Sequence, residues 1–161
     1  MKLQFAKLLN DVITPTKRKG DGCYDIYPHF ESIEVRFEPH EIKMLPTGLV
    51  SKFSNKYRMA VRERGSNSKS GLLTVSGQID SNYRGEMFLS LYNSNSVPLV
   101  ITKAVKEVKK TKELIQVPYS KAVAQFAMER VPKCKIKISP LAKITKHKTE
   151  RGDGKLGSSG K

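Results

Sequence analysis

A carboxylate and an aromatic side chain lie three residues apart in the stretch 77–86. Asp80 and Tyr83 stand between Gly77 and Gly85, and an alternating apolar run follows at 87–92. This pattern predicts a hairpin with Asp80 in the turn and Tyr83 on its far side. The two side chains could then face one small planar ligand. A surface turn, with Asp80 bonded to its own backbone and Tyr83 packed in the core, is the alternative.

A second stretch, residues 62–71, has the chemistry of a phosphate-binding loop. Arg64 offers a planar fork of donors that matches phosphate oxygens. Gly65 lets the backbone approach a ligand closely, and Ser66 offers a hydroxyl and an amide. These three neighbours predict an anion contact.

The C-terminal stretch combines an arginine with a glycine- and serine-rich tail. Arg151 precedes Gly152, Gly154, Gly157 and Gly160, and two serines stand at 158 and 159. Glycine costs the most backbone entropy to order, so such a tail holds no single conformation by itself. It could close as a lid when a phosphate binds its amides and the arginine. A plain flexible linker is the alternative.

Short segments in which apolar and polar residues alternate must position the side chains named above. Alternation of apolar and polar residues at 33–37, 56–62 and 135–138 predicts strands with one buried face. The N-terminal segment 1–9 is expected to be the first strand. A further strand, 122–126, carries Gln125 as its one amide, for a ligand or for a structural hydrogen bond. Many short strands between turn clusters favour an all-β barrel or sandwich.

The bulk composition limits the classes of protein. The 161 residues are 38% hydrophobic, enough for one folded domain, and no apolar run reaches 18 residues. Cys23 and Cys134 are expected to be reduced thiols in a cytoplasm, since the sequence shows no export signal. The lysine-rich stretch 102–115 is expected to be an exposed insertion between two strands, although a short helix also fits its spacing.

The net charge of +15 favours a polyanionic partner, either nucleic acid or a small phosphate compound. A basic nucleic-acid-binding or regulatory protein therefore remains an alternative function. The aromatic residues, 7% of the chain, show no spacing typical of a base-stacking platform.

Five stretches, taken together, resemble the motifs of the trimeric dUTP diphosphatases (dUTPases), and the likeness spans roughly residues 3 to 160. They are Gly22–Ile26, Arg64–Ser66, Gly77–Gly85, Ala124–Gln125 and Arg151–Gly160. The third closely matches the family pattern Gly-x-Ile-Asp-x-x-Tyr-Arg-Gly, and the fifth is similarly specific. The variants around the second and fourth look like those of dUTPases from phages and prophages of Gram-positive bacteria.

The resemblance implies a fold, an assembly and a reaction. The fold would be all-β, a dUTPase-like β-barrel or jelly roll (β-clip), over residues 1–148 with the lysine-rich insertion near 102–116. Residues 149–161 would be a mobile lid. The protein would be a homotrimer with shared active sites that hydrolyses dUTP to dUMP and diphosphate with Mg²⁺ and keeps uracil out of DNA. It would need no nucleic acid and no membrane, and would work in the cytoplasm, that of a bacterial host if phage-encoded.

The resemblance also implies roles for residues of the first and third motifs. Asp80 would orient and activate the attacking water. Tyr83 would stack on the deoxyribose and exclude a 2′-hydroxyl. The backbone from Gly77 through Ile79 to Tyr83 would contact the uracil edge. Asp25 would contact Mg²⁺ through water.

The remaining motifs would bind the phosphates. Arg64, Ser66 and Gln125 would hold phosphate oxygens. The tail would close over the nucleotide, and its contributing residues would be Arg151, Leu156, Gly157 and Ser158.

This sequence departs from the family pattern at three of these positions. Cys23 replaces a glycine, Gly65 stands where many members have serine, and Leu156 replaces an aromatic residue that covers the uracil. In a fourth departure, Lys155 replaces a glycine of the tail. The related dCTP deaminases carry a catalytic glutamate five residues after the glycine that closes the third motif. Ser90 occupies that position here, and a hydroxyl does not shuttle protons as a carboxylate does. Deamination is therefore disfavoured.

Overall fold

The computed structural model of the protein describes residues 2–154 and divides the chain into two compact units. The first unit ends at Val131 and the second begins at Pro132. The boundary expected near residue 148 thus lies inside the second unit, and the domain division made from the sequence stays a prediction. Within residues 2–154, no helix is long and apolar enough to cross a membrane.

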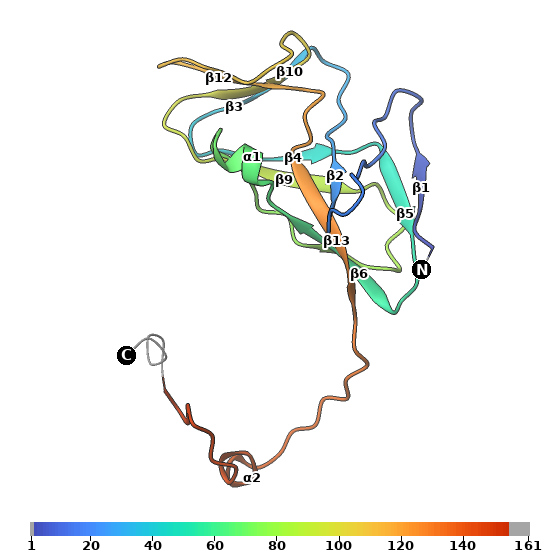
Figure 1. Ribbon diagram of the computed structural model, residues 1–161, viewed down its shortest axis with the longest axis vertical. Coiled ribbons are helices and arrows are strands. Elements are labelled where there is room, and N and C mark those ends of the chain that lie inside the picture. Colours follow the sequence, from blue (N-terminus) through green and yellow to red (C-terminus); the bar gives the residue numbers. More distant parts are fainter. Residues whose placement is uncertain (1, 155–161) are drawn as a thin grey trace. The chain divides into compact units, whose positions relative to one another are not determined.

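The first unit consists of four small sheets (Figure 1). A two-stranded sheet pairs β1 (Gln4–Lys7) with β5 (Leu49–Lys52). A four-stranded sheet has the order β11 (Lys109–Lys110), β12 (Ile115–Pro118), β10 (Leu99–Thr102), β3 (Glu34–Phe37). A second four-stranded sheet has the order β2 (Tyr24–Ile26), β13 (Ala124–Arg130), β6 (Tyr57–Arg62), β8 (Gln78–Ile79). A three-stranded sheet has the order β4 (Ile42–Pro46), β9 (Phe88–Asn93), β7 (Leu72–Thr74).

Neighbouring strands are antiparallel except for β10 and β12, which are parallel. Two short helices complete the described chain, α1 (Gly65–Ser68) after β6 and α2 (Leu141–Thr145) in the second unit. The expectation of an all-β fold is confirmed.

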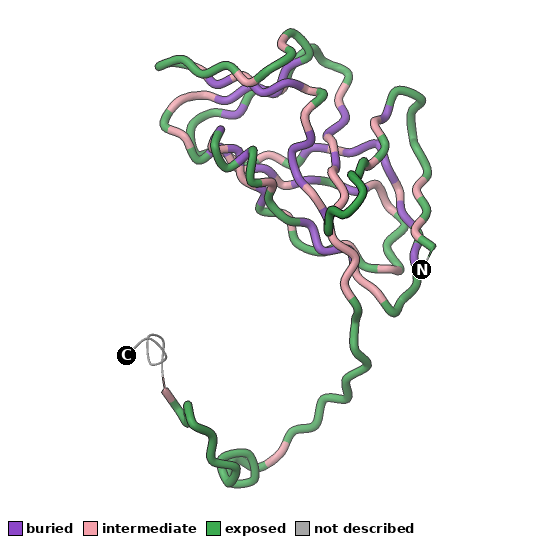
Figure 2. Tube along the Cα trace, in the orientation of Figure 1, coloured by how far each residue is buried: buried purple, intermediate pink, exposed green. Residues whose placement is uncertain are grey.

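Period-two alternation builds the core of the first unit. Along β9, Leu89 and Leu91 are fully buried while Phe88 is 42% exposed, as expected for a strand with one face inward. On β13, the ring of Phe126 is buried and stacks on Tyr24 at 5.3 Å between ring centroids. Each such large apolar side chain contributes about 1.5–3 kcal/mol when it is fully buried. Figure 2 shows these buried segments running through the sheets.

Four of the five predicted strands are confirmed and one is wrong. The segment 1–9 contains β1, and β13 begins within the segment 122–126. The segments 33–37 and 56–62 contain β3 and β6. The segment 135–138 is not a strand, and Ile136 and Ile138 are 96% and 95% exposed. Figure 2 shows exposed backbone along this part of the chain. Alternation creates a candidate buried face, but a strand also needs a hydrogen-bonded neighbour, and residues 2–154 offer this segment none.

The hairpin predicted around Asp80 is also corrected. Its true arms are β7 and β9, which pair Thr74 with Leu91, and the connecting segment 75–87 is long. Within that segment β8 turns away and pairs with β6, where Ile79 lies opposite Met59. The strands on either side of Asp80 therefore belong to different sheets, because local turn signals predict a chain reversal but not which strand becomes the neighbour.

The lysine-rich stretch lies between β10 and β12 and contains no helix. Its strand β11 pairs antiparallel with β12, so that Lys109 lies opposite Gln116. All of its lysines are exposed.

Candidate active site

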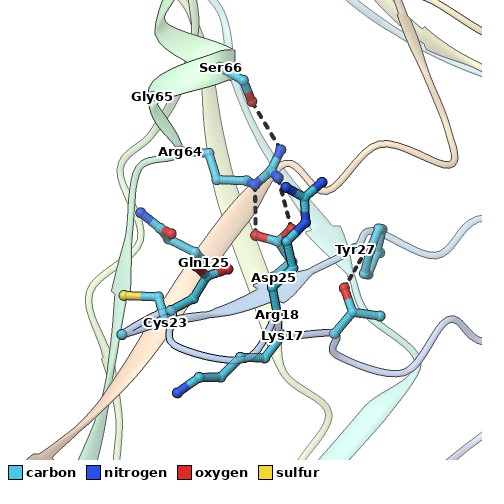
Figure 3. A pocket seen from close by; sticks show the side chains of 12 residues that line it. Lys17, Arg18, Cys23, Asp25, Tyr27, Arg64, Gly65, Ser66 and Gln125 are labelled. Atoms are coloured by element: carbon cyan, nitrogen blue, oxygen red, sulfur yellow. Dashed lines mark hydrogen bonds and ion pairs between the residues drawn. The ribbon is translucent and has the colours of Figure 1, made fainter.

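Strand register brings three of the sequence motifs to one place. On β13, Gln125 lies opposite Asp25 of β2 on one side and opposite Arg62 of β6 on the other. Arg64 and Ser66 follow directly after β6, where the chain enters α1. Asp25, Arg64, Ser66 and Gln125 line an open pocket of about 690 Å³ (Figure 3).

A bidentate ion pair joins the first and second motifs in this pocket. The Arg64 guanidinium donates from Nε to Asp25 Oδ1 at 2.7 Å and from Nη2 to Asp25 Oδ2 at 2.8 Å. Its Nη1 donates to Ser66 Oγ at 3.0 Å. Both charged side chains are about one-quarter exposed, so the pair is reachable from the pocket. A fork of this kind fixes the orientation of the arginine as well as its position.

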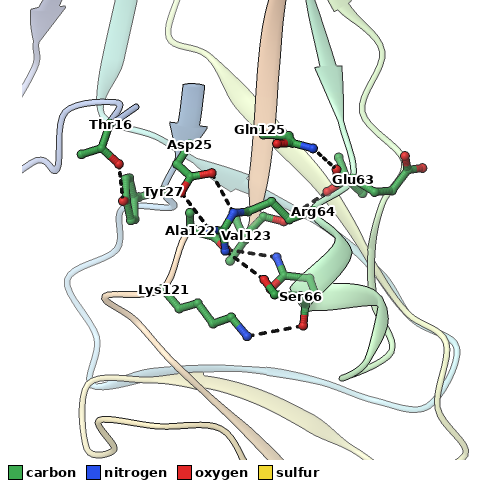
Figure 4. Close-up of polar contacts among 12 residues, drawn as sticks. Thr16, Asp25, Tyr27, Glu63, Arg64, Ser66, Lys121, Ala122, Val123 and Gln125 are labelled. Carbon is green, nitrogen blue, oxygen red and sulfur yellow. Dashed lines mark hydrogen bonds and ion pairs between the residues drawn. The ribbon is translucent and has the colours of Figure 1, made fainter. Parts of the chain in front are cut away.

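Backbone and amide contacts hold the loop beneath that arginine. Arg64 O accepts from the amide of Asn67 at 2.8 Å, which forms the first turn of α1. Asn67 is buried, and its Nδ2 donates to the carbonyl of Ala122 just before β13 at 3.0 Å. Gln125 donates to Glu63 O at 2.7 Å, as Figure 4 shows. Asn67 was not predicted from the sequence, because an asparagine in a Ser- and Gly-rich loop looks like an ordinary turn residue.

A second cation lies behind the loop. Lys121 Nζ donates to the carbonyl of Ser66 at 3.5 Å (Figure 4). Partial burial lowers the pKa of Lys121, and the positive charge of Arg64 lowers it further. The neighbourhood of Arg64 is therefore rich in positive charge.

Asp80 and Tyr83 lie outside this pocket. Asp80 is exposed, and its backbone carbonyl accepts from the amide of Tyr83 at 3.1 Å. The Tyr83 ring is 44% exposed, and its hydroxyl donates to the carbonyl of Glu86 at 2.8 Å. Tyr83 is thus no core residue. The absence of a side chain at Gly85 makes this ring position possible, since a Cβ there would meet the ring.

The other predicted residues of the third motif are placed by β6. Gly77 is exposed, and its carbonyl accepts from the amide of Val61 at 3.2 Å. Ile79 is partly buried and belongs to the apolar cluster of the core. The structure therefore brings Asp25, Arg64, Ser66 and Gln125 together, and separates them from the segment that carries Asp80 and Tyr83.

The fifth motif belongs to the second unit. Arg151 is exposed, and its Nε donates to Gly154 O at 3.3 Å, while Gly152 adopts a positive φ of 53°. The predicted binding residues Leu156, Gly157 and Ser158 lie outside the described residues.

Comparison with known sequences identifies relatives. A model of the dUTPase family matches residues 10–106. The deoxyuridine 5′-triphosphate nucleotidohydrolase of Nautilia profundicola is 30% identical over 166 aligned residues, which cover 100% of both chains. The Pol polyprotein of caprine arthritis encephalitis virus is 30% identical over 145 residues, which cover 89% of this chain but only 11% of the polyprotein.

Comparison with solved structures gives the same fold. A variant of the Staphylococcus bacteriophage 80alpha dUTPase, solved with dUpNHpp, has a TM-score of 0.76 at 22% identity, over 99% of each chain. The dUTPase from phage phi11 of S. aureus has a TM-score of 0.68 at 20% identity, over 86% of this chain and 96% of the other. The expectation of a dUTPase-like subunit is confirmed. The chain belongs to the dUTPase family.

Proposed function

We propose that this protein hydrolyses dUTP to dUMP and diphosphate. The observation that carries the proposal is the pocket in which Asp25, Arg64, Ser66 and Gln125 converge from separate motifs of the family. Its arginine fork and hydroxyl are donors suited to phosphate oxygens, and the concave site fits a small nucleotide. Arg64, Ser66 and Gln125 then bind the phosphate chain.

The two alternative functions find no comparable support. A nucleic-acid-binding protein needs an extended basic surface with base-stacking groups, whereas the cations near Arg64 surround one pocket. A deaminase needs a proton shuttle at position 90. Ser90 instead lies on β9, where its amide donates to Ser76 Oγ at 2.7 Å, and it lies outside the pocket.

The separation of Asp80 from Arg64 supports a site shared between subunits. Hydrolysis requires a water positioned beside the phosphate chain. The base, Asp80, must therefore lie close to the donors on the Arg64 loop that bind the phosphates. In a homotrimer, the exposed Asp80 and Tyr83 of one copy meet the phosphate-binding pocket of a neighbouring copy.

The carboxylates of the pocket fit Mg²⁺ held mainly by the substrate. Asp21 and Asp25 line the pocket, and Mg²⁺ prefers such hard oxygen donors, often through its own waters. Within residues 2–154, no group of three or more His, Cys, Asp or Glu side chains forms a dedicated metal site. Asp25 already accepts from Arg64 on both oxygens, so it would contact the ion through water. When bound, the ion neutralises charge that develops on the leaving diphosphate.

The remaining catalytic and binding roles fall to residues of the chain itself. Asp80, as an exposed carboxylate, accepts the proton of the attacking water and orients its lone pair. Tyr83 presents the face of its ring to the deoxyribose, where a 2′-hydroxyl would collide with it. The backbone between Gly77 and Ile79 contacts the uracil edge. Arg64 and Ser66 hold oxygens of the phosphates throughout.

Residues 149–161 act as a lid over the bound nucleotide in this proposal. Arg151 offers the triphosphate a charge-assisted fork, and Leu156, Gly157 and Ser158 complete the cover. The protein works in the cytoplasm, that of a bacterial host if phage-encoded. The phage origin of the solved structures above supports assignment to the phage type of the family.

Turnover measurements test this function. Purified protein with Mg²⁺ should convert dUTP to dUMP far faster than it converts dCTP, dTTP or UTP. Asp80→Asn should fold normally, bind nucleotide, and lose at least about 10²-fold in kcat, as expected when a general base is removed. Glu113→Gln, in the exposed insertion, is the matched control for loss of a carboxylate. Equal turnover of dCTP and dUTP, or a normal kcat for Asp80→Asn, would contradict the proposal.

A further inference from the structure

Two cationic side chains that belong to none of the five motifs also line the phosphate-binding pocket. Lys17 and Arg18 lie in the loop of residues 16–22, which precedes β2. Lys17 Nζ lies 4.8 Å from the centroid of the Tyr24 ring, so a cation–π contact engages its charge. Arg18 is exposed and takes part in none of the ion pairs formed among residues 2–154.

The loop holds Arg18 at a defined place. Thr16 and Asp25 exchange two backbone hydrogen bonds, of 3.1 and 2.7 Å, which join the start of the loop to β2. The amide of Asp21 donates to the carbonyl of Arg18 at 3.2 Å and closes a turn. Figure 3 shows the Arg18 side chain extending from this turn toward the Asp25–Arg64 pair.

The charges around this pair do not balance. Asp25 accepts from Arg64 through both of its oxygens, so its negative charge is paired with that guanidinium. Asp21, the other carboxylate of the pocket, forms no ion pair among the described residues. Lys121, whose Nζ donates to the carbonyl of Ser66, adds a further positive charge nearby. The lining thus holds the three cations Lys17, Arg18 and Arg64 against the two carboxylates, and this excess of positive charge favours binding of an anion.

We propose that Arg18 is a further phosphate-binding residue, which holds the part of the nucleotide that leaves as diphosphate. The inference rests on the proposed function and adds a specificity-determining contact to it. A triphosphate carries more charge than Arg64 can neutralise while it is paired with Asp25. A second guanidinium supplies the missing donors, and its planar fork suits two oxygens of neighbouring phosphates. The mononucleotide product lacks these phosphates and does not use Arg18.

The test compares nucleotides that differ only in their phosphates. Titration calorimetry with dUpNHpp and with dUMP, together with KM and kcat for dUTP, is carried out on wild type and Arg18→Gln. The variant should bind dUpNHpp about 10- to 100-fold more weakly, the range expected for one charge-assisted contact, and KM should rise by a similar factor. Binding of dUMP should change less than about twofold. Arg18→Lys keeps the positive charge but lacks the planar fork, so its affinity for dUpNHpp should lie between those of wild type and Arg18→Gln.

Lys19→Gln is the matched control, since Lys19 belongs to the same loop and does not line the pocket. This variant also removes one positive charge, and its affinity for dUpNHpp should stay within about twofold of wild type. The comparison distinguishes a direct contact between Arg18 and phosphate from long-range electrostatic attraction. Unchanged dUpNHpp affinity in Arg18→Gln, or an equal loss for Lys19→Gln or for dUMP, would overturn the role of Arg18. If wild type itself fails to turn over dUTP, the proposed function fails instead, and this outcome is visible before any variant is made.

Discussion

Gly85→Ala should displace the Tyr83 ring without unfolding the protein. A Cβ at position 85 would clash first with the Tyr83 hydroxyl oxygen, and would lie 2.6 Å from Cζ and 3.0 Å from Cε2, well inside ordinary contact. The neighbours are the far end of one side chain rather than backbone. Because the ring is 44% exposed, it can swing into solvent; Cζ must move by about 0.8 Å to restore a contact near 3.4 Å, and the hydroxyl oxygen must move further.

The cost in stability should be small. The swing breaks the hydrogen bond from the Tyr83 hydroxyl to Glu86 O, which contributes about 0.5–1.5 kcal/mol net at such a site. For a chain of this size each kcal/mol shifts Tm by about 2–4 °C, so the variant should melt about 1–6 °C below wild type.

The cost in function should be larger. A reacting group misplaced by about 1 Å can lose about 10²-fold in rate, so kcat/KM for dUTP should fall about 10- to 100-fold. Since Tyr83 is proposed to exclude a 2′-hydroxyl, the ratio of kcat/KM for dUTP to that for UTP should fall as well. Calorimetric melting and parallel kinetics with both nucleotides measure these changes.

Tyr83→Phe is the matched control for this prediction. It removes the same hydrogen bond but leaves the ring free to keep its position, so it should lose similar stability and less selectivity. Wild-type discrimination between dUTP and UTP in Gly85→Ala would refute the argument that Gly85 positions the ring.

Two further predictions concern the tail and the pH dependence of stability. Deletion of residues 151–161 should leave the Tm of the unliganded protein nearly unchanged and should lower kcat strongly. The reason is that a glycine-rich lid contributes only once nucleotide is bound. Turnover of dUTP at the wild-type rate by the truncated protein would contradict the role of these residues as a lid. Hydrogen bonds from Arg62 and Arg58 lower the pKa of Glu129 below its ordinary 4.5, so these ion pairs stabilise the fold above that pH and are lost as the pH falls through the lowered value. Glu129→Gln should therefore be slightly less stable than wild type to urea at pH 7, and the difference should shrink progressively as the pH falls below 4.5; a difference that stays constant through that fall would exclude the ion pairs as its cause.

The sequence by itself determined the class of fold and predicted most of the chemistry that is proposed for the site. Alternation at 33–37 and 56–62 predicted β3 and β6, because one buried face is a property of the strand alone. The donor types at Arg64 and Ser66 predicted an anion site, because a guanidinium fork and a hydroxyl have that chemistry wherever they lie.

Only the tertiary structure decided which groups meet. Asp25 and Arg64 are 39 positions apart, yet β2, β13 and β6 place them in contact. Because β8 runs antiparallel to β6, with Gln78 opposite Ala60 and Ile79 opposite Met59, the chain moves away from the Arg64 end of β6 as it approaches Asp80. Ile136 and Ile138 alternate with lysines as a strand would, but no neighbour hydrogen-bonds to them within residues 2–154. Local patterns report what each segment prefers, whereas the contacts between segments depend on backbone hydrogen bonds and core packing between residues far apart in the chain.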